Sequence, residues 1–227
     1  MPRSRNLLLL ALTASLSFVL VVAPVAAAAD PRVLPPDARA HGKSLAEWAA
    51  EWWQWALGQP VATNPLVDQT GAQCANDQSG KVWFLAGTTG GSVDRTCAVP
   101  TGTALFFPIV NVVTCAFPTD PPEQQTEAFL RGQVNPLAQG ATNLSLTIDG
   151  VAVEDVERFY TESALFGMVL GPDNLFGLPA GQVIDPCADA GYYVMLPPLP
   201  PGEHTIEFGG SLPGFPAINV TYTLTVG

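Results

Sequence analysis

The sequence predicts a mainly β protein: an antiparallel β-sandwich or jelly roll with one N-terminal, tryptophan-rich amphipathic helix packed on it. Roughly seven to nine short apolar segments alternate with turns, which is typical of sandwich folds. The turns are rich in Gly and Pro, which number 21 and 22. One stretch, residues 44–58, combines helical periodicity with signals for both helix ends.

Residues 1–29 are predicted to be a signal peptide. Arg3 and Arg5 precede an apolar run over 7–25, and the alanines at 26–29 offer cleavage sites. No later run approaches the roughly 20 apolar residues that a spanning helix needs. We therefore expect a secreted, extracellular or periplasmic protein that is not inserted in the membrane after cleavage. Residues 30–43 are predicted to form an extended arm, and 44–227 a single domain.

The charge balance excludes one class of partner. Only 13% of the residues are charged, and loss of the two signal arginines leaves seven basic and twenty acidic residues, a formal charge of −13. A surface of this sign repels phosphate backbones, so nucleic acid is not an expected partner.

The segment 44–58 is predicted to be a helix with defined ends. Ser44 and Glu47 form a capping box, Gly58 is expected to close the helix in a left-handed conformation, and Pro60 prevents its continuation. At about 100° per residue one broad face is apolar. That face comprises Leu45, Trp48, Ala49, Trp52, Trp55 and Ala56.

Two interpretations of this helix stay open. In the first, the apolar face packs on a β-sheet and each buried indole N–H finds an acceptor. In the second, Trp53 and Trp55 at the flanks line a groove with Glu47, Glu51 or Gln54, an arrangement typical of sugar sites. The second interpretation gives the candidate ligand-binding residues Trp53, Trp55 and Glu51.

The four cysteines are predicted to form two disulfides, because their number is even and the chain is expected to be exported. Three pairings are possible. We favour Cys74–Cys97 with Cys115–Cys187, since the first pair brackets one compact segment and would contribute roughly 3 kcal/mol. No metal site is predicted, because no C-x-x-C spacing occurs.

The first half of the domain contains three predicted strands and one further helix. Residues 81–86 form a short apolar strand, and 93–99 are expected to pair with it across a Gly-rich turn. The most hydrophobic strand spans 103–113, where Pro108 is expected to bend the strand or to place it at an edge or a bulge. Residues 126–134 are predicted to form a short helix.

The second half is predicted to be strands and loops. Asp149-Gly150 is the strongest hairpin signal, joining strands at 144–148 and 151–153. Residues 159–170 are expected to be strand and 171–190 a loop held by Cys187. The remaining predicted strands are 191–196, 203–208 and 218–226.

Four motifs resemble a group of uncharacterised exported bacterial proteins: E-W-W-Q-W-A-L, N-P-L-V-D-Q-T-G-x-x-C, S-G-K-V-W-F-L-A-G and R-T-C-x-V-P-x-G-x-A-L-F-F-P-I. This resemblance covers most of the mature chain and implies export. The C-terminal segments P-P-G-E-H-T-I and T-I-D-G-V resemble hairpins of extracellular immunoglobulin-like sandwiches, which implies fold alone.

The residues offer little support for catalysis. No G-x-S-x-G elbow occurs and the chain has two histidines. We therefore expect a non-enzymatic binding or envelope-associated protein without a cofactor, with a carbohydrate or another exported protein as candidate partner. One alternative is a secreted polysaccharide hydrolase that uses Glu47 or Glu51 as general acid. Another is a purely structural exported protein.

Overall fold

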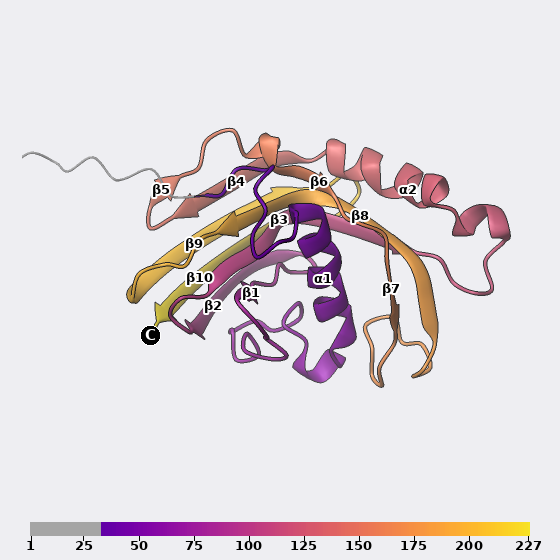
Figure 1. Ribbon diagram of the computed structural model, residues 1–227, viewed down its shortest axis with the longest axis horizontal. Helices are drawn as coiled ribbons and strands as arrows, with labels where there is room; N and C mark the ends of the chain where they lie inside the picture. Colours follow the sequence, from indigo (N-terminus) through magenta and orange to yellow (C-terminus); the bar gives the residue numbers. More distant parts are fainter. Residues whose placement is uncertain (1–32) are drawn as a thin grey trace, which may run out of the picture.

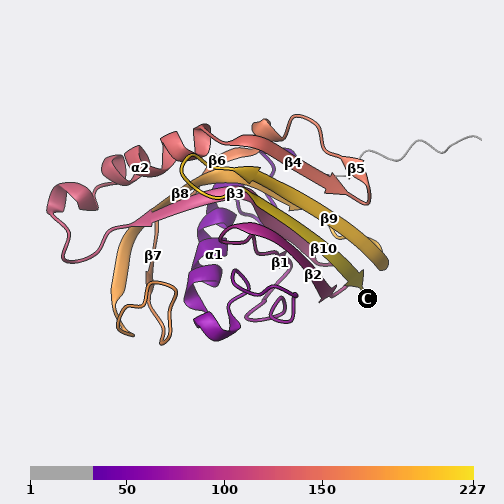
Figure 2. The same ribbon diagram turned by 180° about the vertical axis from the view of Figure 1, so that it is seen from behind.

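The computed structural model describes residues 33–227, and the predicted signal peptide lies outside them. Two five-stranded sheets pack together, with helix α1 (Leu45–Gly58) within the concave side of their arch and α2 (Glu127–Gln139) on the convex side (Figures 1 and 2). The predicted class, a mainly β sandwich with a tryptophan-rich helix, is confirmed.

The first sheet has the order β1-β3-β8-β6, with β7 also paired to β8. Strands β3 and β8 form its antiparallel centre, with a register shift between Pro108 and Val110 that confirms the predicted bulge. Its strands are β1 (Val82–Phe84), β3 (Ala104–Cys115), β6 (Tyr160–Glu162), β7 (Phe166–Val169) and β8 (Val183–Leu196).

The second sheet has the order β2-β10-β9-β4-β5. Asp149 and Gly150 both have positive φ in the turn that joins β4 to β5, which confirms the predicted hairpin. Its strands are β2 (Gly91–Val99), β4 (Thr142–Ile148), β5 (Val151–Ala152), β9 (Gly202–Ser211) and β10 (Ile218–Val226). Short 3₁₀ turns lie at Val61–Thr63, Pro122–Gln125 and Val156–Phe159.

The predicted pairing of 93–99 with the Trp83 strand is wrong. β1 pairs in parallel with β3, and β2 pairs in parallel with β10 in the other sheet. The Gly-rich segment between β1 and β2 carries the chain from one sheet to the other. Trp83 and Val93 therefore belong to the same core from opposite sheets.

Strand β2 lies at an edge of the second sheet. The 68–78 segment runs beside it: the Thr96 amide donates to the Thr70 carbonyl at 3.0 Å, and the Cys74–Cys97 disulfide joins the two. The second disulfide joins Cys115 of β3 to Cys187 of β8. Both predicted pairings are confirmed, and they indicate an oxidising compartment.

The two ends of α1 form differently from one another. The capping box is present as predicted, since Ser44 Oγ accepts from the Glu47 amide and the Glu47 carboxylate accepts from the Ser44 amide. The predicted left-handed closure at Gly58 is wrong: Gly58 is helical, and Gln59 leaves the helix with φ −91° and ψ 144°. The ring of Pro60 disfavours the helical conformation at Gln59, which ends the helix there.

Strand β8 is longer than predicted. It begins at Val183, within the segment predicted to be loop, and is fully buried from Cys187 to Leu196. Its alternate residues face α1 on one side, where Tyr193 and Met195 lie. On the other side Ala190 faces α2, and Val194 faces the second sheet. This strand is therefore buried on both faces.

Gly191 of β8 lies against β3 with no room for a side chain. A Cβ placed there would lie 2.6 Å from Asn111 Cβ and 2.6 Å from the Val110 carbonyl oxygen. Because both contacts are part of the β3 strand, neither atom can move without moving that strand.

We expect Gly191→Ala to lower the free energy of unfolding by about 2 kcal/mol, the typical cost of overpacking a core. Chemical denaturation followed by tryptophan fluorescence measures this change. The matched control is Gly132→Ala, in the exposed middle of α2 with open space around a new Cβ. That variant should gain about 0.5 to 1 kcal/mol. Equal behaviour of the two variants would contradict the close-approach explanation.

Candidate functional site

The four tryptophans of α1 are all buried, and each indole N–H donates to an acceptor. Three acceptors are main-chain carbonyls: Ala40 for Trp48 at 2.9 Å, Leu85 for Trp52 at 3.0 Å and Asn76 for Trp55 at 2.9 Å. Trp53 differs, because its Nε1 donates to the carboxylate oxygen Oδ2 of Asp189 at 2.6 Å. The rings therefore act mainly as core, as the first interpretation of the helix predicts.

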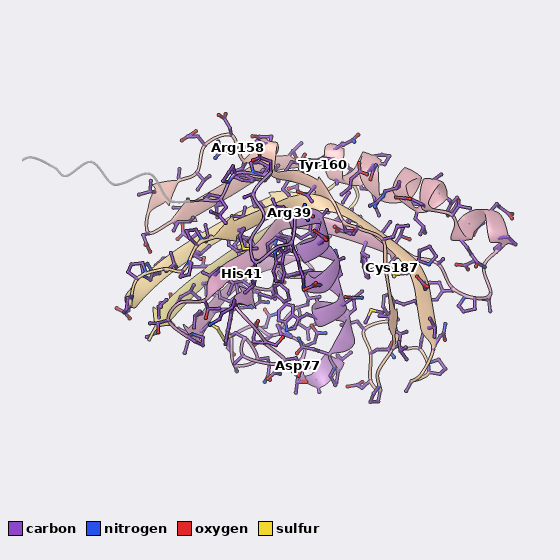
Figure 3. The ribbon with its side chains drawn as sticks, in the orientation of Figure 1. Arg39, His41, Asp77, Arg158, Tyr160 and Cys187 are labelled. Carbon is purple, nitrogen blue, oxygen red and sulfur yellow. A yellow bond between two sulfur atoms is a disulfide. The ribbon has the colours of Figure 1, made fainter. Side chains whose placement is uncertain are left out.

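A buried hydrogen-bonded network continues from Asp189. The Tyr193 hydroxyl donates to Asp189 Oδ2 at 2.8 Å, and the Asn111 side-chain amide donates to the Tyr193 oxygen at 2.8 Å. The other carboxylate oxygen, Asp189 Oδ1, is buried and has no partner among the described residues. Figure 3 labels Cys187, two residues before Asp189 on β8.

Arg131 of α2 lies beside this network, and its guanidinium binds backbone rather than the carboxylate. Its guanidinium donates to the main-chain carbonyls of Asp189 at 2.9 Å and Ser163 at 2.6 Å. Glu127 and Glu162 pair with the same guanidinium at 3.4 and 3.6 Å. The Asp189 carboxyl is thus buried without a directly bonded positive charge.

This environment changes the protonation of the network. Burial raises the pKa of Asp189 to about 8, although the bonds from Trp53 and Tyr193 and the charge of Arg131 favour the ionised form. Burial, with the adjacent Asp189 carboxyl, also raises the pKa of Tyr193 well above its usual value. Asp189 therefore holds its proton at neutral pH, unlike an exposed carboxyl.

A cavity of about 360 Å³ lies between α1, β3 and the tip of the β9–β10 hairpin. Trp53 and Asn111, the two pocket-facing ends of the Asp189 network, both line it. The rest of the lining is mostly apolar. It consists of Leu57, Leu66, Gly87, Thr88, Thr89, Pro108, Ile109, Val110, Val112, Leu175, Gly210, Leu212, Phe215, Pro216 and Ile218.

A second buried group holds the loop that forms one wall of this cavity. Arg95 of β2 is only 3% exposed, and its Nη1 donates to the carbonyls of Ala86 at 2.8 Å and Gly87 at 2.9 Å. The Tyr222 hydroxyl, 2.9 Å from the same nitrogen, also bonds Ala86. The main chain at Ala86 and Gly87 is therefore fixed by side chains from two strands of the second sheet.

The structure brings only one of the three predicted ligand-binding residues to the cavity. Trp53 lines it. Trp55 is 8% exposed and packs against Phe84 with ring centroids 5.5 Å apart. Glu51 is half-buried and pairs with Lys43. Trp53, Trp55 and Glu51 are thus not gathered around one opening.

The other candidate acid, Glu47, and the two histidines do not line the cavity. Glu47 serves the helix cap and pairs with Arg39 at 3.3 Å, near the start of α1, where Arg39 and His41 are labelled in Figure 3. His204 bonds Asp149 at 2.7 Å and the Pro200 carbonyl at 2.9 Å. Over residues 33–227, no cluster of three or more His, Cys, Asp or Glu side chains has metal-binding geometry. In the same range, no helix has both the length and the apolar character to cross a membrane.

Sequence reasoning missed Asp189, Tyr193, Asn111 and Arg95. Asp189 lies in a stretch predicted to be loop, where an acid is normally solvated. The available signal was its setting: it stands between Ala188 and Ala190, directly before the apolar run 191–196. Small residues on both sides of an acid, leading into a buried strand, are compatible with a buried carboxyl.

Comparison with known proteins gives no family. No protein-family model and no curated protein sequence matches the chain. The cysteine protease inhibitor EhICP2 from Entamoeba histolytica is 15% identical, with a TM-score of 0.22 over 58% of this chain and 86% of its own. Amebosin is 13% identical, with a TM-score of 0.17 over 60% of this chain and 96% of its own. Likenesses this weak carry no argument about this protein.

We expect Asp189 to make stability depend on pH. In the unfolded chain an Asp carboxyl has a pKa of about 3.9, whereas in the folded chain its pKa is about 8. The folded state therefore binds the proton more tightly. This contribution to the free energy of unfolding is complete below about pH 4 and is lost as pH rises to about 8, by up to about 1.4 kcal/mol per pH unit.

Asp189→Asn removes this ionisation while keeping a neutral side chain of the same shape. The variant should gain stability relative to the wild type as pH rises from about 5 to about 8, and the difference should level off above that. Urea denaturation of both proteins at intervals across this range measures it. Parallel profiles of wild type and variant would contradict a raised carboxyl pKa.

Proposed function

We propose that this protein is an exported, non-enzymatic binding protein whose ligand is a small, mainly apolar molecule held in the cavity beside Trp53. The observation that carries the proposal is the cavity itself, about 360 Å³ in volume and lined mostly by apolar side chains, with few polar groups. Binding sites for small molecules have this size and this character.

The polar groups of the lining are few. Asn111 is hydrogen-bonded to Tyr193, while Thr88 and Thr89 directly follow Ala86 and Gly87, whose main-chain atoms Arg95 and Tyr222 hold. A few polar groups in an apolar wall orient a ligand. Export is supported by the two disulfides, together with the leader-like sequence of residues 1–29.

The other candidate functions have less support from the described residues. A sugar presents many hydroxyls, which a largely apolar cavity leaves unpaired. For a hydrolase, Glu47 is occupied by the helix cap and Glu51 by Lys43, and neither lines the cavity. The binding function is therefore the one that the site supports best.

Cyclohexanol is a suitable probe, since it is compact, apolar and carries one polar group. We expect it to bind with 1:1 stoichiometry and a dissociation constant on the order of a millimolar, as for other ligands of so few atoms. Amide and indole chemical shifts in a ¹H–¹⁵N NMR titration measure the constant and locate the site through the Trp53 resonance.

Two variants test whether the cavity is the site. Thr89→Trp places a large side chain on an exposed lining residue and should abolish binding. Thr101→Trp, at an exposed turn that does not line the cavity, is the matched control and should bind as the wild type does. Wild-type protein that does not bind the probe, or equal binding by both variants, would refute the proposal.

A further inference from the structure

The cavity is connected to the buried carboxyl by a chain of three side chains. Asp189 Oδ2 lies 2.8 Å from the Tyr193 hydroxyl, which lies 2.8 Å from the Asn111 amide nitrogen. Asn111 lines the cavity, whereas Asp189 and Tyr193 lie behind its wall. The chain therefore links a group that can gain or lose a proton to a group that a ligand can touch.

When Asp189 is ionised, the direction of both hydrogen bonds that join these three side chains is fixed. A carboxylate only accepts, so Tyr193 must donate its single hydrogen to Asp189. The Tyr193 oxygen then accepts from the Asn111 NH₂ group. The amide oxygen of Asn111 receives no donor from residues 33–227, so this side chain offers the cavity that acceptor beside the second N–H of its NH₂ group.

With Asp189 protonated, the chain is more stable in the opposite direction. A proton on Oδ1 would be a buried donor without an acceptor, because this oxygen has no partner within the described chain. A proton on Oδ2 instead donates to the Tyr193 oxygen, and Oδ2 still accepts from Trp53. The Tyr193 hydrogen then turns to Asn111, whose amide flips so that its oxygen accepts and its NH₂ group is offered to the cavity.

The described side chains around Asp189 do not set the direction of these hydrogen bonds. That direction therefore depends on whether Asp189 is protonated. Arg131, from α2, contacts the Asp189 main-chain carbonyl and is paired with Glu127 and Glu162. From α1 the contact is the Trp53 indole, which donates in both states, and from β8 it is Tyr193. Ser163 bonds the Asp189 backbone rather than its carboxyl.

We infer that the protonation of Asp189 sets the hydrogen-bonding polarity of the binding pocket: Asn111 offers only donors when Asp189 is protonated, and offers its acceptor oxygen when Asp189 is ionised. The inference rests on the proposed binding function and adds its ligand class. The neutral pocket takes an apolar molecule with a hydrogen-bond acceptor such as a ketone, whereas an alcohol suits both states because it can donate and accept.

The test compares cyclohexanol with cyclohexanone, which have the same ring and differ in whether they can donate. NMR titrations are made at about pH 6 and about pH 9.5, on either side of the pKa of about 8. We expect cyclohexanone to bind about tenfold more weakly at the higher pH, since its oxygen then faces the Asn111 oxygen. Cyclohexanol should bind with a similar constant at both values.

Two variants separate the chain from a general effect of pH. Asp189→Asn presents its amide oxygen to Trp53 and Tyr193 as the ionised carboxylate does, so cyclohexanone should bind weakly at both pH values. Tyr193→Phe breaks the chain and frees the Asn111 amide to rotate, so the two ligands should bind alike at both. These opposite outcomes are not expected from a purely structural role for either residue.

The failures are distinguishable. If neither compound binds the wild type, the proposed binding function and this inference both fall. If cyclohexanone binds equally well at both pH values while Thr89→Trp still blocks it, the pocket stands and the polarity switch is refuted. A pH effect that persists in Tyr193→Phe also refutes it, because the chain would then play no part.

Discussion

The structure depends on satisfying the indole N–H groups of α1 once the rings are buried. A buried donor without an acceptor costs about 1 to 3 kcal/mol, so four tryptophans on one helix require four acceptors in fixed places. Ala40 lies before the helix, while Asn76 and Leu85 follow it in the chain. The fourth acceptor, Asp189, comes from β8. The helix thus fixes the segments on both sides of it, along with the central strand of the first sheet.

The Asp189 contact differs from the other three because a carboxyl replaces a carbonyl. A carbonyl in that position would satisfy Trp53 equally well and would carry no proton. Burial of this carboxyl costs free energy, because it has no bonded cation and one of its oxygens has no partner in the described chain. Such a cost, placed directly behind the wall of an apolar cavity, is typical of a group retained for a site rather than for stability.

Sequence reasoning succeeded where the signal is local. The capping box at Ser44, the Asp149-Gly150 turn and the bulge at Pro108 all depend on residues close in the chain, and all three are present. It failed where contacts between segments distant in the chain determine the secondary structure. Residues 183–190 contain Pro, Asp and Ala, which are depleted in strands. They form the first part of β8 because the strand is covered on both faces from Cys187 onward and Cys187 is joined to β3.

The candidate site was the harder part for the same reason. Trp53 was identified by its position at the edge of the apolar face of the helix, which is a local property. Its partner is 136 residues away in the chain, and the pocket is built from α1, β3, the segment after β1 and the β9–β10 hairpin. No spacing in the sequence encodes such a meeting point, because it arises from the way the two sheets and the helix pack.

The segment that runs beside β2 limits how other chains can associate with this protein. An edge strand with open amide and carbonyl groups is a template on which other chains can add strands. Here the bond from Thr96 to Thr70 occupies part of that edge, and Cys74–Cys97 keeps the covering segment in place. In a reducing environment the cover would lose its covalent anchor, and the covered part of the β2 edge would be held by hydrogen bonds alone. The disulfide thus protects this sheet edge against aggregation only in a compartment that keeps the two cysteines oxidised.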